Sequence, residues 1–201
     1  MKRRVVITGA GVVSSLGFGV DQFWGSIKEK NGISEITRFD VSEMSTKVGA
    51  EIKDFDPNLF MDRKEARRMD RYNQFAMAAS KMAVENAKLD LDSLNKDRCG
   101  VIVGSGIGGI ETFEDQYKVL LSKGPGRVSP FFIPMMISNM ASGRIAIQYG
   151  FMGFNECVVT ACATSNNAIG DSFKVIQRGD ADLMLTGGAE ASLTTISCRF
   201  L

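Results

Sequence analysis

The sequence predicts an α/β fold in which helices cover both faces of a sheet. Strand-like and helix-like segments alternate along the chain. The strand-like segments are continuous apolar runs, which is typical of strands buried on both faces. No internal repeat and no low-complexity tract interrupts the 201 residues. We therefore expect a single domain over residues 1–201. The predicted strands are residues 5–8, 100–103, 157–160 and 181–186.

The first part of the chain is predicted to hold a strand, a helix and an irregular segment. Residues 5–8 are β-branched and run into a glycine turn. Asp21 is a candidate N-cap for a helix that stops at Asn31-Gly32. A short strand is expected at residues 46–52. A single long helix is expected from Arg63, because apolar residues then recur at steps of three and four.

The second part continues the alternation of strands and helices. A glycine-rich stretch, residues 104–109, follows the strand at residues 100–103, and we name it the glycine loop. An apolar loop bracketed by prolines occupies residues 129–134. Helices are expected at about residues 110–121, from residue 135, and at residues 165–177.

Composition excludes several classes of protein. The chain has 24 basic and 23 acidic residues, so its charge does not favour nucleic acid or a membrane surface as a partner. The four cysteines lack metal-ligand spacing, and no stretch approaches about 18 apolar residues. We expect a reduced, cytoplasmic protein without a bound metal. It contains no histidine, so any imidazole base must come from outside these residues.

Cys162 is the candidate nucleophile. It lies between a predicted strand and a predicted helix, where the unpaired N–H groups and positive dipole of the helix favour a thiolate. The alternative is a small buried hydrophobe in a crossover turn.

The glycine loop matches G-x-G-x-x-G and follows a strand, as a dinucleotide fingerprint does. That fingerprint requires an acidic residue about twenty positions further on, where this chain has Lys123, Gly124 and Pro125. The alternative is a close-packing loop with Ile107 at its tip.

Basic residues gather at the start of the helix predicted from Arg63. Cations at a helix N-terminus oppose the helix dipole, at a cost of roughly a few tenths of a kcal/mol each. The cluster is either a solvated helix face or a site for a compact acidic partner. Phe131, Phe132 and Ile133 are similarly open to two interpretations, as core or as the lining of an apolar pocket or subunit interface.

Five motifs, in this order and at these distances, resemble the N-terminal half of a bacterial β-ketoacyl-acyl carrier protein synthase II, a condensing enzyme of fatty-acid synthesis. They occupy residues 5–9, 104–109, 129–134, 160–163 and 187–190. The resemblance covers essentially the whole chain. It implies the N-terminal half of a thiolase-like fold, with a mixed five-stranded sheet between helices.

The resemblance also implies an activity and a site. Cys162 carries the acyl chain as a thioester, and decarboxylative Claisen condensation with malonyl-acyl carrier protein elongates it. Substrates arrive on phosphopantetheine, with no further cofactor. The backbone N–H of Cys162 supplies one oxyanion donor. The implied acyl pocket is Ile107, Phe131, Phe132 and Ile133, with the last three reaching across a homodimer interface. The implied docking patch for acyl carrier protein is Lys64, Arg67 and Arg68.

In the family a pair of histidines, a lysine and a second oxyanion donor belong to the C-terminal half, which is absent from this chain. We therefore expect a truncated or frameshifted fragment that holds half of an active site. Two alternatives stay open: a non-catalytic chain-length-type partner subunit, and a thiolase-fold acyltransferase that uses coenzyme A esters. The retained Cys162 disfavours the first, and the docking patch disfavours the second.

Overall fold

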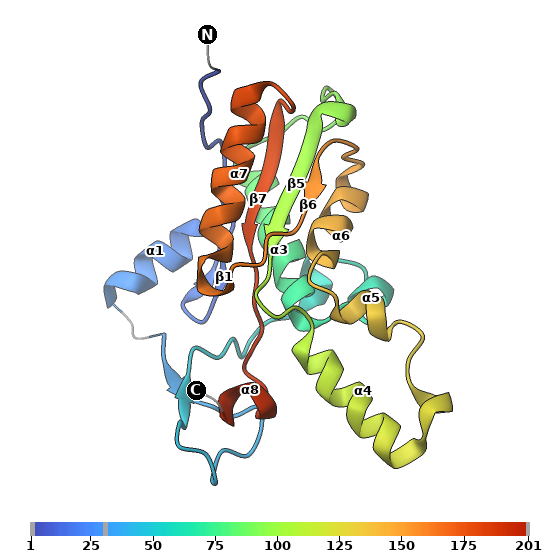
Figure 1. Ribbon diagram of the computed structural model, residues 1–201. Helices are drawn as coiled ribbons and strands as arrows, with labels where there is room; N and C mark the ends of the chain where they lie inside the picture. The colour runs from blue at the N-terminus through green and yellow to red at the C-terminus, as the bar shows by residue number, and fades with distance from the viewer. Residues whose placement is uncertain (1–2, 30–31, 200–201) are drawn as a thin grey trace.

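The computed structural model describes residues 3–29 and 32–199. Its main sheet contains three strands, β5 Cys99–Gly104, β6 Asn155–Glu156 and β7 Leu183–Gly188. They are parallel and lie in the order β6-β5-β7 (Figure 1). Two short antiparallel pairs are separate from this sheet: β1 Val13–Ser14 with β2 Gly17–Phe18, and β3 Ser34–Glu35 with β4 Val48–Gly49.

Helices make up most of the remaining regular structure. The α-helices are α1 Val20–Glu29, α2 Arg63–Ala66, α3 Arg71–Asn86, α4 Ile110–Lys123, α5 Phe132–Met136, α6 Met140–Tyr149, α7 Thr164–Arg178 and α8 Thr195–Arg199. Short 3₁₀ turns are η1 Pro57–Leu59, η2 Lys96–Arg98, η3 Pro125–Arg127 and η4 Ala161–Ala163.

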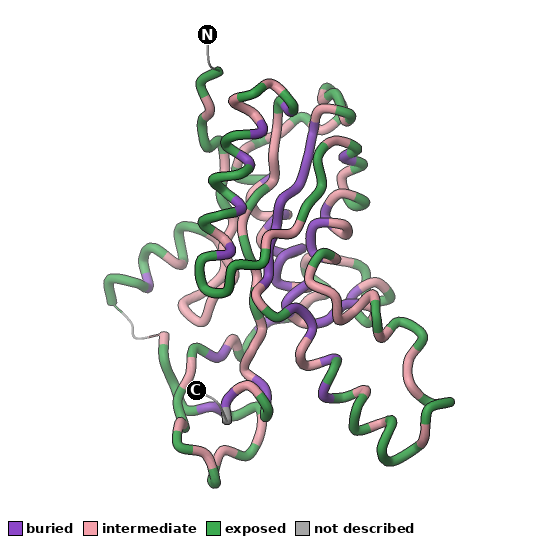
Figure 2. Tube along the Cα trace, in the orientation of Figure 1, coloured by how far each residue is buried: buried purple, intermediate pink, exposed green. Residues whose placement is uncertain are grey.

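Strand β5 is the centre of the fold. It pairs with β7 from Cys99 opposite Leu183 to Gly104 opposite Gly188, and with β6 along its other edge. All of its residues are buried (Figure 2). Because both edges and both faces are covered, this strand reads as a continuous apolar run in the sequence.

The two faces of the sheet pack on different helices. Val101 and Val103 of β5 contact the cluster formed with α3 and α6. Ile102, which points to the opposite face, packs with Ala168 and Val175 of α7. Figure 1 shows the same arrangement, with α7 on one side of the sheet and α3 and α6 on the other. The predicted α/β class with helices on both faces is confirmed.

The predicted five-stranded mixed sheet is wrong for the described chain, which has three parallel strands in its main sheet. Residues 5–8 form no strand there, and Val6 and Ile7 are 63% and 86% exposed. Residues 157–160 also lie outside any strand, because β6 ends at Glu156. An apolar β-branched segment becomes a strand only where a neighbouring backbone completes its hydrogen-bond ladder.

The single helix expected from Arg63 is two helices. The side chain of Asp62 accepts a hydrogen bond from the Lys64 N–H at 2.7 Å and caps α2. Asp70 accepts one from the Tyr72 N–H at 3.1 Å and caps α3. An aspartate that binds the N–H two residues ahead starts a helix instead of continuing one.

Three smaller boundaries also differ from expectation. Helix α1 starts at Val20, so Asp21 lies in its first turn and is not its N-cap. The stop expected at Asn31 falls outside the described residues. Helix α5 occupies part of the expected proline loop, because Pro134 lies in its first turn, where a missing N–H breaks no helical hydrogen bond.

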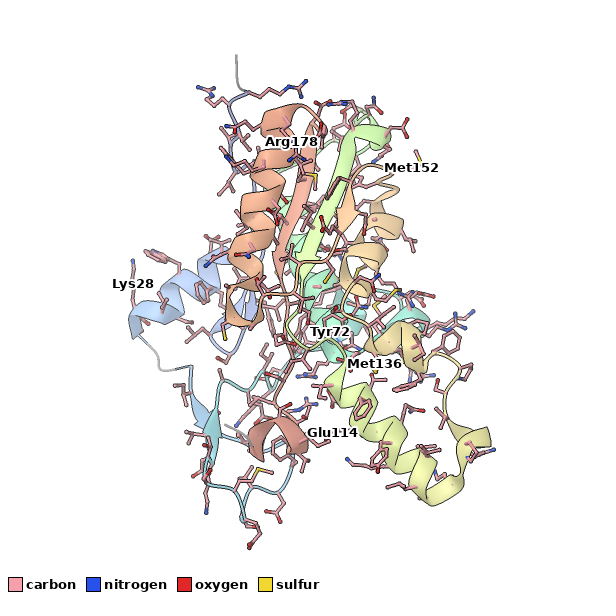
Figure 3. All side chains as sticks on the ribbon, in the orientation of Figure 1. Lys28, Tyr72, Glu114, Met136, Met152 and Arg178 are labelled. Carbon is pink, nitrogen blue, oxygen red and sulfur yellow. The ribbon has the colours of Figure 1, made fainter. Side chains whose placement is uncertain are left out.

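Helix α4 extends away from the sheet (Figure 1). A hydrogen bond links its first half to α8. The buried carboxylate of Glu114 accepts a hydrogen bond from the Ile196 N–H at 2.8 Å, and Figure 3 shows Glu114 beside α8. Over the two described ranges, none of the helices combines the length and apolar character that a membrane crossing requires.

Candidate active site

Cys162 lies in η4, directly before α7, and is exposed. No side chain caps the start of α7, so its first N–H groups have no side-chain partner. The Thr160 N–H donates to the Thr164 hydroxyl at 2.9 Å and closes the turn around the cysteine. We name residues 160–164 the nucleophile turn. Its geometry presents an exposed thiol at the N-terminal end of a helix, where the helix dipole favours the thiolate of a cysteine nucleophile.

The nucleophile turn contains an unusual backbone conformation. Ala161 has φ of 50°, in the left-handed region that residues with a Cβ rarely occupy. Such a residue costs about 1–3 kcal/mol and persists only where its surroundings enforce it. The strain lies one residue before Cys162.

The end of β5 holds this turn in place. A Cβ built on Gly104 would lie 2.1 Å from Cγ2 of Thr164 and 2.4 Å from the carbonyl oxygen of Val158. A glycine is therefore needed where β5 ends, since any side chain would push the turn off the sheet. Thr164 itself is buried. The nucleophile turn thus sits at the carboxyl ends of parallel strands, where α/β folds place their sites.

The glycine loop is already occupied by a carboxylate. Glu190 Oε2 accepts hydrogen bonds from the N–H groups of Gly106 at 2.8 Å and Ile107 at 3.2 Å. In a dinucleotide site such N–H groups are left for a phosphate. The loop also packs against α5, because the Gly109 N–H donates to the Met136 carbonyl at 2.8 Å; Figure 3 shows Met136 where α5 meets α4. These contacts favour the close-packing interpretation.

The residues assigned to the acyl pocket lie on adjoining elements. Ile107 is 52% exposed at the tip of the glycine loop, and Phe131 and Ile133 are exposed at the start of α5. Phe132 is partly buried, and its ring centroid lies 6.3 Å from that of Phe113 on α4. The hydrogen bond between the loop and α5 brings these segments together. Their exposure favours the pocket or interface interpretation over a core, although their role in binding an acyl chain stays a prediction.

The docking patch lies on and just after α2. Lys64 and Arg67 are exposed, and Arg68 is partly buried. Because α2 is a single turn with Arg67 as its C-cap, these cations do not oppose the start of a long helix dipole. The expected dipole cost was wrong, and it followed from the error of a single long helix.

An ion-pair cluster anchors the docking patch to the fold. Glu65 accepts from Arg144 of α6 at 2.7 Å and lies 3.9 Å from Arg68. The Arg68 guanidinium also lies over the Phe131 ring, with 4.7 Å between Cζ and the ring centroid. The docking patch and the aromatic start of α5 therefore form one continuous surface.

A buried carboxylate links the starts of α3 and α4. Asp70 Oδ2 accepts hydrogen bonds from the Thr112 hydroxyl at 2.7 Å and from the Thr112 N–H at 2.9 Å. Burial raises the pKa of Asp70 above its usual value, and the Thr112 hydrogen bonds partly oppose the rise. Nearby, burial raises the pKa of Glu111, which is paired with Arg38.

The sequence did not predict two features of the site. Glu190 was seen only as part of a motif, although its partners lie more than 80 positions away in the chain. A pocket of about 270 Å³ also lies beside it, between the β3–β4 region, α3 and the segment after β7. Its charged lining residues are Arg38, Glu51, Arg71 and Glu190. The sequence carries no local signal for either, because both depend on contacts between distant segments.

The fold and the cysteine turn define the class of protein. Residues 2–201 match the profile of the family described as "Beta-ketoacyl synthase, N-terminal domain". The chain belongs to this family and has its thiolase-like fold.

Particular relatives sharpen the comparison. The chain is 52% identical to 3-oxoacyl-(acyl-carrier-protein) synthase 2 of Synechocystis over 98% of its length, which is 47% of that protein. It is 51% identical to the synthase of the same name from Staphylococcus aureus, over 96% of the chain and 47% of the relative. The solved ishigamide ketosynthase/chain length factor superposes with a TM-score of 0.89 at 30% identity, over 100% of this chain and 50% of that chain. The chain therefore spans about half the length of the curated relatives it matches.

Proposed function

We propose that this chain forms the N-terminal half of a β-ketoacyl-acyl carrier protein synthase that elongates fatty acyl chains. The observation that carries the proposal is the exposed Cys162, held at the start of α7 by a strained turn. The chain is similar to synthases whose names include acyl carrier protein, and this similarity supports acyl carrier protein as the substrate carrier.

Acyl transfer follows from the geometry. The Cys162 thiolate attacks the thioester carbonyl carbon of an acyl-phosphopantetheine and forms a new C–S bond. The carbonyl oxygen becomes an oxyanion, for which the Cys162 backbone N–H is a donor. Collapse of the intermediate expels the phosphopantetheine thiolate and leaves the acyl group on Cys162. This step requires neither a metal nor a redox cofactor.

The second half of the reaction needs groups that these 201 residues do not supply. Decarboxylation of the malonyl donor generates a carbanion, which must be stabilised before it attacks the acyl-cysteine. The chain has no histidine to assist. We propose that condensation requires the other half of a full-length synthase, and that the chain alone stops at the thioester.

The partners follow from the surfaces. Lys64, Arg67 and Arg68 offer concentrated positive charge to the acidic carrier protein. The exposed aromatic start of α5, with Phe131, fits a homodimer contact that completes the acyl pocket.

All four cysteines are free, as in a reducing cytoplasm.

The test is acylation of the purified chain by acyl-acyl carrier protein, followed by intact mass spectrometry. We expect one acyl adduct, which Cys162→Ala abolishes. The matched control is Cys157→Ala, which removes a partly buried cysteine and should leave the adduct intact. No adduct on a chain shown to be folded by circular dichroism would contradict the proposal.

A further inference from the structure

We propose that Glu190 positions the glycine loop and, through Ile107, sets the acyl chain-length preference of the synthase. The inference rests on the proposed function, because it assigns specificity to that same site. Glu190 follows β7, and the Ala189 N–H donates to the Gly104 carbonyl at 3.0 Å just before it. This bond carries the chain across the end of β5 and brings Glu190 to the loop.

One carboxylate satisfies several donors of the glycine loop. Oε2 accepts from the N–H groups of Gly106 and Ile107, at 2.8 and 3.2 Å. Oε1 accepts from the Ser105 hydroxyl at 3.2 Å, and the oxygen of that hydroxyl accepts from the Gly108 N–H at 2.9 Å. Three successive N–H groups are thus held by Glu190, directly or through Ser105. Charge-assisted bonds of this kind are the strong ones in proteins.

The loop is also confined between Glu190 and the nucleophile turn. A Cβ built on Gly106 would lie 2.9 Å from Glu190 Oε2 and 3.6 Å from Cα of Ala161. The residue before the nucleophile therefore lies close to the loop that presents Ile107. A shift of this loop changes the distance between Ile107 and the nucleophile turn, and with it the space left for the acyl chain.

The same contacts indicate that Glu190 positions the loop and does not act as a catalytic residue. Glu190 faces the backbone of the loop and hydrogen-bonds no atom of Cys162. Its removal should move the loop without removing the thiol or the oxyanion donor. We therefore expect the preference among acyl donors to change more than the rate with the best donor.

The first measurement is amide hydrogen exchange in native protein, Glu190→Ala and Glu190→Gln. In Glu190→Ala the Gly106 and Ile107 amides should exchange at least about tenfold faster, because their acceptor is lost. Glu190→Gln keeps one oxygen for these donors and should restore most of the protection. Amides of β5 should stay protected in both variants, which shows that the fold is intact. Glu43→Ala, at an exposed acidic residue between β3 and β4, is the matched control.

The second measurement is the rate of Cys162 acylation with hexanoyl and myristoyl carrier protein. The ratio of the two rates should change at least about fivefold in Glu190→Ala and return toward the native ratio in Glu190→Gln. An unchanged ratio, or unchanged exchange at Gly106 and Ile107, would overturn the inference. If native protein forms no adduct with either donor, the proposed function fails instead, and the exchange data alone still decide whether Glu190 holds the loop.

Discussion

The guanidinium of Arg68 lies over the ring of Phe131, with 4.7 Å between Cζ and the ring centroid. The first residue belongs to the docking patch and the second to the predicted acyl pocket, so one contact joins the two surfaces. A cation over an aromatic ring is worth about 0.5–1 kcal/mol at an exposed site. Under the proposed function, an acidic partner that binds Arg68 would therefore lie next to the aromatic start of α5.

Charge reversal in the docking patch should weaken carrier binding. We expect Lys64→Glu with Arg67→Glu to lower the affinity for acyl carrier protein by at least about tenfold at low salt. The remaining affinity should depend less on salt, because fewer opposite charges meet at the interface. The measurement is a series of titrations by isothermal calorimetry at increasing ionic strength. Lys174→Glu, an exposed site on α7, is the control, and equal effects at both sites would exclude a local docking patch.

Removal of the buried Asp70 carboxylate should alter how stability depends on pH. Burial raises its folded pKa above the unfolded value of 3.8. Between these two values the native state binds more protons than the unfolded state, so the contribution of Asp70 to the free energy of unfolding falls as pH rises. Asp70→Asn removes this dependence, and it also replaces one of the two acceptor oxygens by an NH2 group, so the N–H of either Thr112 or Tyr72 loses its acceptor, at a cost of about 1–3 kcal/mol.

The measurement is urea unfolding of native protein and Asp70→Asn between about pH 3 and pH 7. The free energy of unfolding of the native protein should exceed that of Asp70→Asn most at the acidic end, and this difference should shrink above pH 3.8. Thr112→Val removes a hydrogen bond that lowers the pKa of Asp70. The decline of the Asp70 contribution to the free energy of unfolding should therefore extend to higher pH. A constant difference between native protein and Asp70→Asn would show that Asp70 has the same pKa in both states.

Asp182 should show the opposite dependence on pH. Hydrogen bonds from Arg98, at 2.6 Å, and Arg3, at 2.7 Å, lower its pKa to about 2. Its stabilising effect is therefore complete above the unfolded value of 3.8 and is lost as pH falls through about 2. A carbon-detected NMR titration of the Asp182 carboxyl should report a larger rise in pKa for Arg98→Ala than for Arg3→Ala, because Arg98 is the larger cause. Equal rises would contradict this ranking.

The sequence predicted best those elements whose signal is local and whose burial is complete. Strand β5 could be located because it is apolar throughout, and α7 because its apolar residues recur at helical spacing. Residues 5–8 carry a similar strand signal but lack a ladder in the described chain. Local propensity could not reveal whether a pairing backbone is present, since that depends on distant segments.

The candidate site shows the same division. The position of Cys162 at the start of a helix could be predicted from the helical spacing that follows it, although the strand expected at residues 157–160 is absent. The break between α2 and α3 had a local signal, because Asp70 is a favoured helix N-cap residue. The helical spacing of the apolar residues predicted a single helix instead. The role of Glu190 had no such signal, because its hydrogen bonds join the end of β7 to a loop more than 80 residues earlier.

The left-handed conformation of Ala161 permits a test of whether strain beside the nucleophile serves acylation. Replacement by glycine relieves about 1–2 kcal/mol of backbone strain. It also adds freedom to the unfolded chain, which offsets about 0.4–1 kcal/mol of that gain. We therefore expect Ala161→Gly to be unchanged or up to about 1.5 kcal/mol more stable in urea unfolding, but slower to acylate at Cys162, because the turn is less restricted.

Lys88 supplies the matched control, since it has the same φ of 50° at the end of α3 and lies outside the nucleophile turn. Lys88→Gly should change stability by a similar amount and leave the acylation rate at the native value. The two variants together separate stability from positioning. If both slow acylation equally, or if neither does, the strained conformation of Ala161 has no special part in presenting the thiol. If only Ala161→Gly is slow, the strain holds the cysteine in its reactive position.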